Sequence, residues 1–379
     1  MAYIPQVAGN TELSAETLTA IGSDIGVGVT VLQDSVETLH AYGDVILTNT
    51  ALMNTWCSAL MNKIVKPRLI AKVYKNRLAV TQKGVLSIGD GVEEIFTVPA
   101  NVHKANNDTA HPTNPFNADL PDVKTAWHVT NAEMTYSTRK KKIKLRRAFI
   151  SFEALEEFVN SIVQALYNRY EWNSQILVKY KLAQMILARI AADKVVEVPS
   201  PVTSDGTGFL AAAREYAGLF DWMSNEYNDA GVPTFTSEDD KYIIMPVGVE
   251  AHVDVKDLAA AFNLDYANFL GRRLPVDRFT FSSIEKADIM TIGGLAEWPF
   301  TEEQETALSK VIGVLCDINI VQFYDTFEPE LWSIENPGEA EICYWLHAAK
   351  VCGISPFADA VVFVEGADEP ETMEVQPGT

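Results

Sequence analysis

The residues best suited to bind a metal are two cysteines and a histidine in the last tenth of the chain. Cys343, His347 and Cys352 carry the sulfur and nitrogen atoms that zinc prefers. Their spacing fits no common zinc pattern, so buried structural roles are the stronger interpretation. We expect no metal site from this group.

Other side chains with catalytic chemistry are scattered. Glu302, Glu303 and Glu305 have the groups for acid/base work, but an exposed acidic turn is the simpler interpretation. The six histidines do not cluster, so no catalytic triad is indicated. There is no GxSxG elbow, GxxxxGK(S/T) phosphate loop or HExxH motif, and the pair Gly26 and Gly28 lacks the third glycine of a dinucleotide fingerprint. We predict no catalytic residues, no cofactor and no enzyme activity.

The strongest concentration of charge is a run of seven basic residues at positions 139–147. Within the run, lysine and arginine alternate with Ile143 and Leu145, which predicts a strand with one charged and one apolar face. Two interpretations stay open: a docking strip for an acidic neighbouring subunit or a phosphate, and a strand face that meets only solvent. The candidates for contacts between subunits are these basic residues and three glutamates that follow them: Arg139, Lys140, Lys141, Lys142, Lys144, Arg146, Arg147, Glu153, Glu156 and Glu157.

An extended polar arm leads into this run, and a very long helix follows it. Apolar residues recur every three or four positions from Phe152, which predicts a helix over residues 152–193 with Ser151 as its N-cap. At 1.5 Å per residue the helix is roughly 60 Å long. The repeat loses its phase near residues 172–174, so a kink, or two helices joined by a turn, is an alternative. The arm has no core of its own and needs partners, which indicates a subunit of a larger assembly.

Composition limits the class of protein. With 379 residues, 47% of them hydrophobic, the chain can bury one large or two ordinary cores. No apolar run reaches the roughly 18–20 residues of a membrane span, and residues 1–10 do not resemble a signal peptide, so we expect folding in a cytoplasm and no membrane partner. Four cysteines without a CxxC pair fit a reducing compartment. Without the seven basic residues the formal charge of −21 becomes −28, so most of the surface should repel nucleic acid.

The rest of the chain predicts mixed helices and strands. Helices are expected after Ser14 and at residues 30–40, 45–64, 209–227 and 254–262. Strands are expected at 93–98, 241–248, 274–281, 289–292, 311–324 and 343–351. Long loops are expected at 101–121 and 228–240, and a disordered acidic tail at 367–379. The strand, helix, strand order over 241–281 is typical of a mixed α/β layer.

Five sequence blocks occur in a distinctive order between about residue 85 and residue 366. They are GVEEIFT (91–97), LPDVKTAWH (120–128), AFISFEALEEFV (148–159), DVKDLAAAFN (254–263) with Asp265 and FLG (269–271), and FADAVVFVEG (357–366). In this order they resemble the major capsid protein of small podophages of the phi29 group. No block alone is specific, and none is a catalytic signature.

The resemblance implies an α+β fold of the Hong Kong 97-like phage capsid type. Its expected parts are an N-terminal arm (1–83), an extended loop (84–147), a peripheral domain with a long spine helix (148–205 and 319–366), a mixed α/β axial domain (206–318) and an acidic tail (367–379). Some members carry an immunoglobulin-like domain beyond this point, and we expect it to be absent here.

The resemblance also implies function and partners. The chain would self-assemble through pentamers and hexamers into the icosahedral or elongated shell that encloses the double-stranded DNA of a tailed phage, without sequence-specific DNA binding. A scaffolding protein and a portal are the other implied partners, and the expected location is the virion, assembled in the host cytoplasm. The alternatives are an encapsulin-type nanocompartment shell and a soluble α/β enzyme with a pocket lined by titratable groups.

Overall fold

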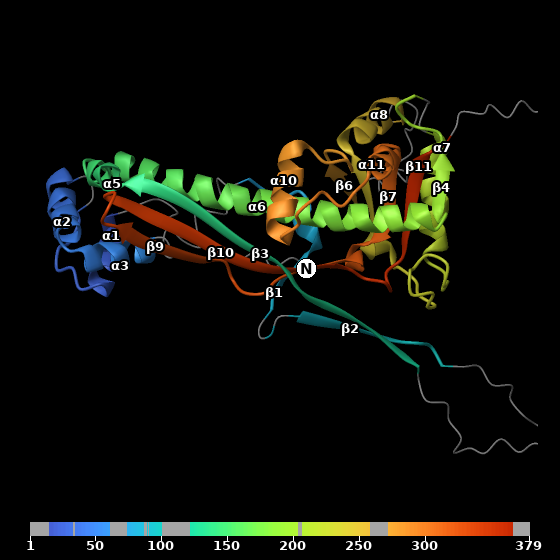
Figure 1. Cartoon of the computed structure of the whole chain (residues 1–379), viewed down its shortest axis with the longest axis horizontal. Helices are drawn as coiled ribbons and strands as arrows, with labels where there is room; N and C mark the ends of the chain where they lie inside the picture. The colour runs from blue at the N-terminus through green and yellow to red at the C-terminus, as the bar shows by residue number, and fades with distance from the viewer. Residues whose placement is uncertain are drawn as a thin grey trace, which may run out of the picture. The chain divides into compact units, whose positions relative to one another are not determined.

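The computed structural model describes residues 15–32, 35–60, 74–86, 89, 91–100, 122–203, 207–257 and 272–366 (Figure 1). The predicted cap Ser14, the loop at 101–121 and the tail at 367–379 lie outside the described residues. The chain divides into two compact units. The first comprises Met1–Asn76, Ala132–Gln175 and Asp325–Lys350, and the second Arg77–Asn131, Ile176–Tyr324 and Val351–Thr379.

Helix α6 (Phe152–Ala191) is the longest element, with 40 residues. Its first turn is capped as predicted, because the Ser151 hydroxyl accepts a hydrogen bond from the backbone N–H of Ala154 at 3.2 Å. The helix is unbroken, so the alternative of two helices joined by a turn is wrong. Where the apolar repeat loses its phase, Ser174 is buried and its hydroxyl donates to the Tyr170 carbonyl at 2.8 Å. The polar side chain is thus satisfied within the helix, which continues through it.

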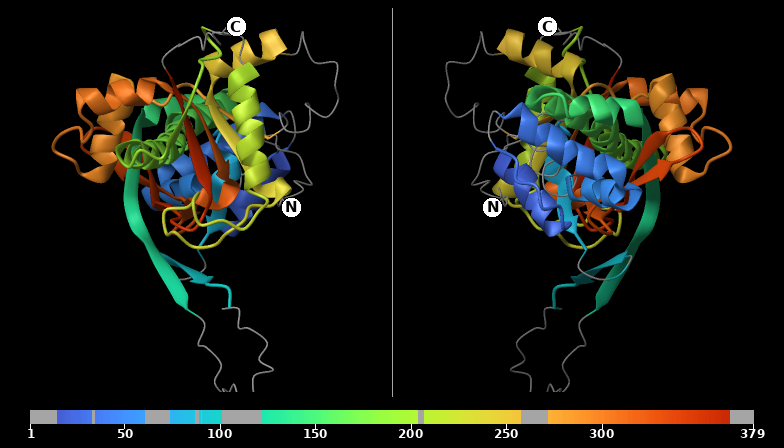
Figure 2. Two further views of the ribbon diagram at one scale, coloured as in Figure 1. Left: turned by 90° about the vertical axis from the view of Figure 1, so that its right-hand side faces the viewer. Right: turned by 90° about the vertical axis from the view of Figure 1, so that its left-hand side faces the viewer.

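The first unit contains three N-terminal helices that lie side by side (Figure 2, right panel). They are α1 (Ala15–Asp24), α2 (Val36–Thr48) and α3 (Thr50–Leu60). Trp56 fills their interior: its indole N–H donates to the Tyr42 hydroxyl at 2.9 Å, and its ring lies 5.2 Å from that of Phe149. The predicted helix at 30–40 starts late, because Ser35 accepts from the Thr38 N–H and so caps α2 from Val36.

Long strands form the second main feature. A six-stranded sheet has the order β1-β8-β10-β3-β2, with β9 also paired to β10. The strands are β1 (Gln82–Val85), β2 (Gly91–Thr97), β3 (Val123–Lys141), β8 (Val321–Asp325), β9 (Glu330–Asn336) and β10 (Glu341–Ile354). The predicted strands at 93–98 and 343–351 correspond to β2 and to the larger part of β10, and the predicted extended arm contains β3.

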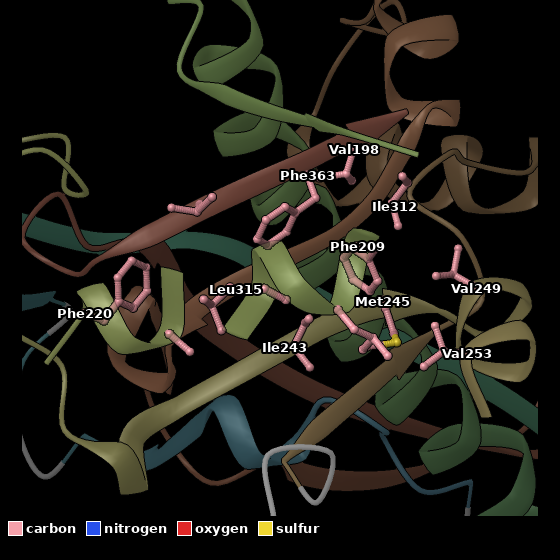
Figure 3. Packing of buried hydrophobic residues seen from close by; sticks show 14 residues of the cluster. Val198, Phe209, Phe220, Ile243, Met245, Val249, Val253, Ile312, Leu315 and Phe363 are labelled. Carbon is pink, nitrogen blue, oxygen red and sulfur yellow. The ribbon is translucent and has the colours of Figure 1, made fainter. Parts of the chain in front are cut away.

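A five-stranded sheet forms the core of the second unit, in the order β4-β11-β7-β5-β6. These strands are β4 (Val195–Val198), β5 (Lys241–Pro246), β6 (Arg273–Val276), β7 (Val311–Asp317) and β11 (Ala360–Glu365). Helix α7 (Thr207–Leu219) covers one face of the sheet, and Phe209 on α7 meets Phe363 on β11 edge to face at 5.5 Å (Figure 3). The apolar face of α7 therefore fixes the helix to the sheet.

The remaining elements of the second unit are short. They are the helices α8 (Val247–Asp257), α10 (Ser283–Gly293) and α11 (Glu302–Ser309), and the 3-10 turns η2 (Ala79–Thr81), η3 (Glu238–Asp240) and η4 (Ile318–Ile320). The predicted mixed α/β layer is present, since β5 leads through α8 toward its parallel neighbour β6.

Several predicted elements were wrong. The strand at 289–292 is part of α10, whose start is fixed by a capping box between Ser282 and Glu285. The strand at 311–324 is two strands, β7 and β8, which belong to different sheets and are separated by η4. The acidic turn expected at 302–305 is the first turn of α11, and its Glu302 and Glu303 are exposed as expected. Carboxylates at this end of a helix interact favourably with the helix dipole. The helix at 209–227 ends at Leu219.

Candidate assembly surfaces

The basic run forms two elements instead of the predicted single strand. β3 ends at Lys141, and Lys142–Ala148 is a short helix, α5. Lysine, arginine, leucine and alanine favour a helix, and Leu145 and Ala148, three positions apart, are both buried while Ile143 is exposed. The alternation of charged and apolar residues was therefore compatible with the two-residue period of a strand and with the 3.6-residue period of a helix. Burial of Leu145 and Ala148 in the folded chain selected the helix.

Part of the run is already paired within the same chain. The Lys142 ammonium lies 2.9 Å from Glu335, and the Arg139 guanidinium lies 3.4 Å from Glu339. Burial, together with the neighbouring Lys144, lowers the pKa of Lys140. Lys142 and Arg139 are less available to another subunit than the unpaired basic residues of the run would be, because binding there would first require the loss of an existing ion pair.

The other members of the predicted contact set remain at the surface. Lys141, Lys144, Arg146 and Arg147 are exposed on the end of β3 and on α5. Beside them an open cleft of about 330 Å³ lies between α2 and α5. On the first turns of α6, Glu153 and Glu157 are exposed and Glu156 is half-buried. Their pairing across subunits stays a prediction.

The root of the β2–β3 hairpin, in the second unit, has one bare apolar face. The antiparallel register places Ile95 opposite Thr125 and Glu93 opposite Trp127. Side chains alternate along a strand, so these positions share a face with Val123 and Val129. Four apolar members of this face are strongly exposed: Ile95 64%, Val123 48%, Trp127 66% and Val129 56%.

The opposite face of the hairpin root is covered within the same unit. Glu94 lies 3.0 Å from the His128 ring, and Phe96 stacks on Phe357 at 5.6 Å. A Cβ added at Gly353 would meet the same His128 ring at 2.2 Å, so the ring packs directly on the backbone of β10. The hairpin root is thus held on one side, which presents the apolar side to solvent in a fixed orientation.

A second bare apolar face belongs to the first unit and lies on β9 of the β9–β10 pair, since Cys343 on β10 is buried and Trp345 is half-buried. Trp332 pairs with Trp345 and Ile334 pairs with Cys343 in the antiparallel register. Trp332 is 56% exposed and Ile334 54% exposed. The opposite face of the pair is covered by α3, because the Ser333 hydroxyl donates to the Asn54 carbonyl at 3.4 Å.

His347 and Cys352, two of the residues considered as metal ligands, have hydrogen-bond partners within the protein. His347 exchanges a hydrogen bond with Thr135 at 3.1 Å, and Cys352 contacts the Leu177 carbonyl through its thiol at 3.8 Å. All four cysteines are free and buried, and burial raises the pKa of Cys57 and of Cys316 to about 12. Within the described ranges, no three His, Cys, Asp or Glu side chains are arranged to hold a metal.

Two buried lysines, one in each unit, are paired with carboxylates. In the first unit Lys350 contacts Asp325 and the Tyr170 hydroxyl, while in the second unit Lys179 lies 2.9 Å from both Asp277 and Glu285. Lys350 therefore has one carboxylate partner and Lys179 has two, and these partners stabilise the buried charges. The Glu285 carboxylate also accepts the Ser282 N–H, so its position is fixed by helix capping.

Neither bare apolar face was predicted from the sequence, although a local signal exists for both. Val123, Trp127 and Val129 alternate with Lys124 and His128, and Trp332 and Ile334 flank Ser333. The alternation indicates two-faced strands. It does not tell which face is covered, because that depends on elements far away in the sequence.

Comparison with known proteins decides the family. The family model described as "Phi29-like phage major capsid protein" matches residues 33–364. The chain belongs to this family. The major capsid protein of Bacillus phage GA-1 is 27% identical over 337 residues, covering 86% of this chain and 64% of the relative. That of Bacillus phage B103 is 28% identical over 348 residues, covering 90% of this chain and 70% of the relative. The chain thus spans about two thirds of the length of these relatives.

Solved structures establish the fold of this phi29-like family member. A chain of the capsid structure of Staphylococcus phage Andhra superposes with a TM-score of 0.57 at 12% identity, covering 79% of this chain and 86% of the other. At this identity the likeness concerns the fold, which is the Hong Kong 97-like capsid fold expected from the resemblance. The family does not favour the alternatives of a nanocompartment shell and of an α/β enzyme. Within the described residues no helix is long and apolar enough to cross a membrane.

Proposed function

We propose that this chain is the shell subunit of a tailed-phage head and assembles with copies of itself through pentamers and hexamers into an icosahedral or elongated capsid. The observation that carries this proposal is the family match over residues 33–364. A capsid protein has a structural role, and we assign no catalytic residues to it. The location that follows is the virion, with assembly in the cytoplasm of the host.

The exposed strand surfaces support self-assembly. Clusters of exposed large apolar side chains are typical of protein interfaces. The hairpin root in the second unit and the β9–β10 pair in the first unit each expose a tryptophan, a residue enriched at interface hot spots. Burial of both faces between copies would remove a large apolar area from water.

Other partners follow from the same role. We propose that packaged double-stranded DNA is enclosed without sequence-specific binding, since a chain of formal charge −21 repels phosphate over most of its surface. A scaffolding protein and a portal are proposed as assembly partners. We further propose that residues 1–83 act as the arm, 84–147 as the extended loop, 148–205 and 319–366 as the peripheral domain, and 206–318 as the axial domain.

The basic run remains a proposed contact between subunits. Lys144 and Arg146 on α5 are exposed, and the acidic Glu153 and Glu157 on α6 are exposed as well. Reversal of Lys144 to glutamate should weaken assembly while leaving the isolated subunit folded. Normal shells from this variant would remove the basic run from the list of contacts.

The test of the shell function is the size of the particles that the full chain forms. Purified protein is examined by sedimentation velocity and negative-stain microscopy, alone and after co-expression with the other head proteins of its phage. Closed shells or capsomer-sized rings are expected. A chain of 41.9 kDa that stays monomeric under both conditions would contradict the proposal.

A further inference from the structure

Lys179 on α6 lies between two carboxylates in the second unit. Its side-chain nitrogen is 2.9 Å from an oxygen of Asp277 and 2.9 Å from an oxygen of Glu285, and the lysine side chain is 2% exposed. An amine and two carboxyl groups are thus in contact where little water reaches the amine. We propose that Lys179 and Asp277 condense to an amide bond within the chain, with Glu285 as the group that moves the protons. The inference goes beyond the shell function and holds for the isolated subunit.

Asp277 is the carboxyl group that the lysine nitrogen faces. Both of its oxygens are within hydrogen-bond reach of this nitrogen, at 2.9 and 3.2 Å, and the carboxyl carbon lies between them. Reacting groups held in contact react much faster than free ones. The Asp277 side chain is 46% exposed, so the carboxyl group has room to turn its face toward the nitrogen, and a leaving water has a path to solvent. The Arg278 guanidinium, 3.4 Å from one oxygen, helps to polarise the group.

Glu285 is suited to move protons and unsuited to react itself. One of its oxygens contacts Lys179, and the other accepts the backbone N–H of Ser282 at 2.7 Å in the capping box of α10. Its side chain is 4% exposed. Loss of an oxygen from this carboxylate would destroy the cap, whereas gain and loss of a proton leave both oxygens in place. Asp277 is therefore the carboxyl group that forms the amide.

Aromatic side chains limit the access of water to the lysine nitrogen. The Phe281 ring lies 5.0 Å from this nitrogen, and it packs against Trp298 with 5.3 Å between ring centres. A site that excludes water favours condensation, because water is a product of the reaction. The same packing holds the amine against its two carboxyl partners.

The reaction releases one water and needs no other reactant. The ammonium gives one proton to the Asp277 carboxylate, and the resulting amine forms a C–N bond to the carboxyl carbon. The nitrogen then passes a second proton to Glu285, which returns it to the leaving hydroxyl as the C–O bond breaks. The products are a neutral amide, one water and the Glu285 carboxylate in its original state. No oxidant or reductant takes part.

The amide would tie α6 to the segment that follows β6. Lys179 and Asp277 are 98 positions apart in the chain, so the bond closes a long loop that stays closed when the protein unfolds. The remaining N–H of the amide keeps a donor beside Glu285. An ion pair of the same residues is the reactant, and it separates on unfolding. The two states therefore differ in covalent structure and are distinguished under denaturing conditions.

Mass spectrometry of the denatured full chain tests the proposal. The parent should be lighter than its sequence by the mass of one water. Trypsin should leave Lys179 uncut, in a branched peptide that also contains Asp277. Lys179→Arg keeps the positive charge but cannot form the amide, so this variant should have its full sequence mass. Glu285→Gln cannot take up the proton and should condense at least about a hundredfold more slowly, followed by the same mass change during storage.

Lys241 provides a matched control within the same chain. Its side chain is 5% exposed and lies 2.5 Å from Asp221, which is 48% exposed, and no second carboxylate among the described residues contacts it. Lys241 and Asp221 should therefore appear in ordinary linear peptides.

Three results would overturn the inference. A parent chain of full sequence mass that trypsin cuts after Lys179 contains an ion pair only. Loss of water from Lys179→Arg would place the condensation elsewhere. Equal condensation at Lys241 would remove the role assigned to Glu285. All three are read from the denatured chain and do not depend on assembly, so they leave the test of the shell function separate.

Discussion

Replacement of Lys350 by methionine tests how strongly the first unit depends on one buried positive charge. The Lys350 side chain is 0% exposed and that of its partner Asp325 is 6% exposed. The ammonium donates to the Asp325 carboxylate and to the Tyr170 hydroxyl, the latter at 2.8 Å, and lies 4.5 Å from the centre of the Tyr170 ring. Methionine has a similar length, so the variant removes the charge and leaves much of the volume filled.

The expected magnitude follows from the cost of a buried charge that loses its partner. The variant leaves the Asp325 carboxylate buried without this cation, a change that typically costs about 3–5 kcal/mol of the free energy of unfolding. The Tyr170 hydroxyl donates to the same carboxylate at 3.0 Å, so part of the carboxylate's hydrogen bonding survives. We therefore expect the lower part of the range. Addition of Asp325→Asn removes the second charge and should recover part of the loss.

Urea unfolding of the unassembled chain, followed by tryptophan fluorescence, measures the change. The control is Arg139→Ala, since Arg139 and its partner Glu339 are 64% and 58% exposed. An exposed pair of this kind contributes at most about 1 kcal/mol. A loss below about 1 kcal/mol for Lys350→Met, or equal losses for the single and the double variant, would refute the argument that burial makes this ion pair indispensable.

Three further variants test other parts of the structure. Glu285→Ala should lower the free energy of unfolding by about 2–3 kcal/mol, because it removes a buried partner of Lys179 and half of a capping box. Gly353→Ala should cost about 1–3 kcal/mol in urea unfolding, because its methyl group would meet the His128 ring at 2.2 Å. Burial raises the pKa of Asp317, so the folded state favours the protonated carboxyl more than the unfolded state does. The free energy of unfolding therefore falls as pH rises from the ordinary aspartate pKa through the raised one. Asparagine does not ionise, so the free energy of unfolding of Asp317→Asn should increase relative to that of the parent over this pH range.

Control variants show whether each loss of stability comes from the interaction named above or from a general disturbance of the fold. Glu302→Ala removes an exposed carboxylate from the first turn of α11 and should cost less than Glu285→Ala. Gly218→Ala adds a methyl group where no atom lies within 4 Å, and in a helix it should be neutral or stabilising. Equal losses for the two glycine variants would contradict the packing argument. A stability difference between Asp317→Asn and the parent that does not change with pH would contradict the raised pKa.

Local patterns in the sequence were sufficient for the elements whose stability is mostly local. The 40-residue α6 follows from its apolar repeat and from Ser151, since helical hydrogen bonds and the N-cap involve residues at most four positions apart. The extended character of β3 was also predicted. The strand predicted at 289–292 was wrong because its β-branched and apolar residues fit a strand as well as a helix. The capping box of Ser282 and Glu285, a local signal that the prediction did not use, starts α10.

The tertiary structure alone decided which faces of these elements are buried and which remain bare. Lys142–Ala148 has a pattern that fits both a strand and a helix, and burial of Leu145 selected the helix. The pairing of Trp332 with Trp345 depends on the register of β9 and β10. The exposure of Trp332 and of Trp127 depends on which elements cover the opposite sides of their strands, α3 in the first unit and Phe357 in the second. The repeat of apolar and polar residues in the sequence indicates that an element has two different faces. Only contacts between residues far apart in the chain determine which of the two is left for a partner, because that choice is made by packing and not by local backbone preference.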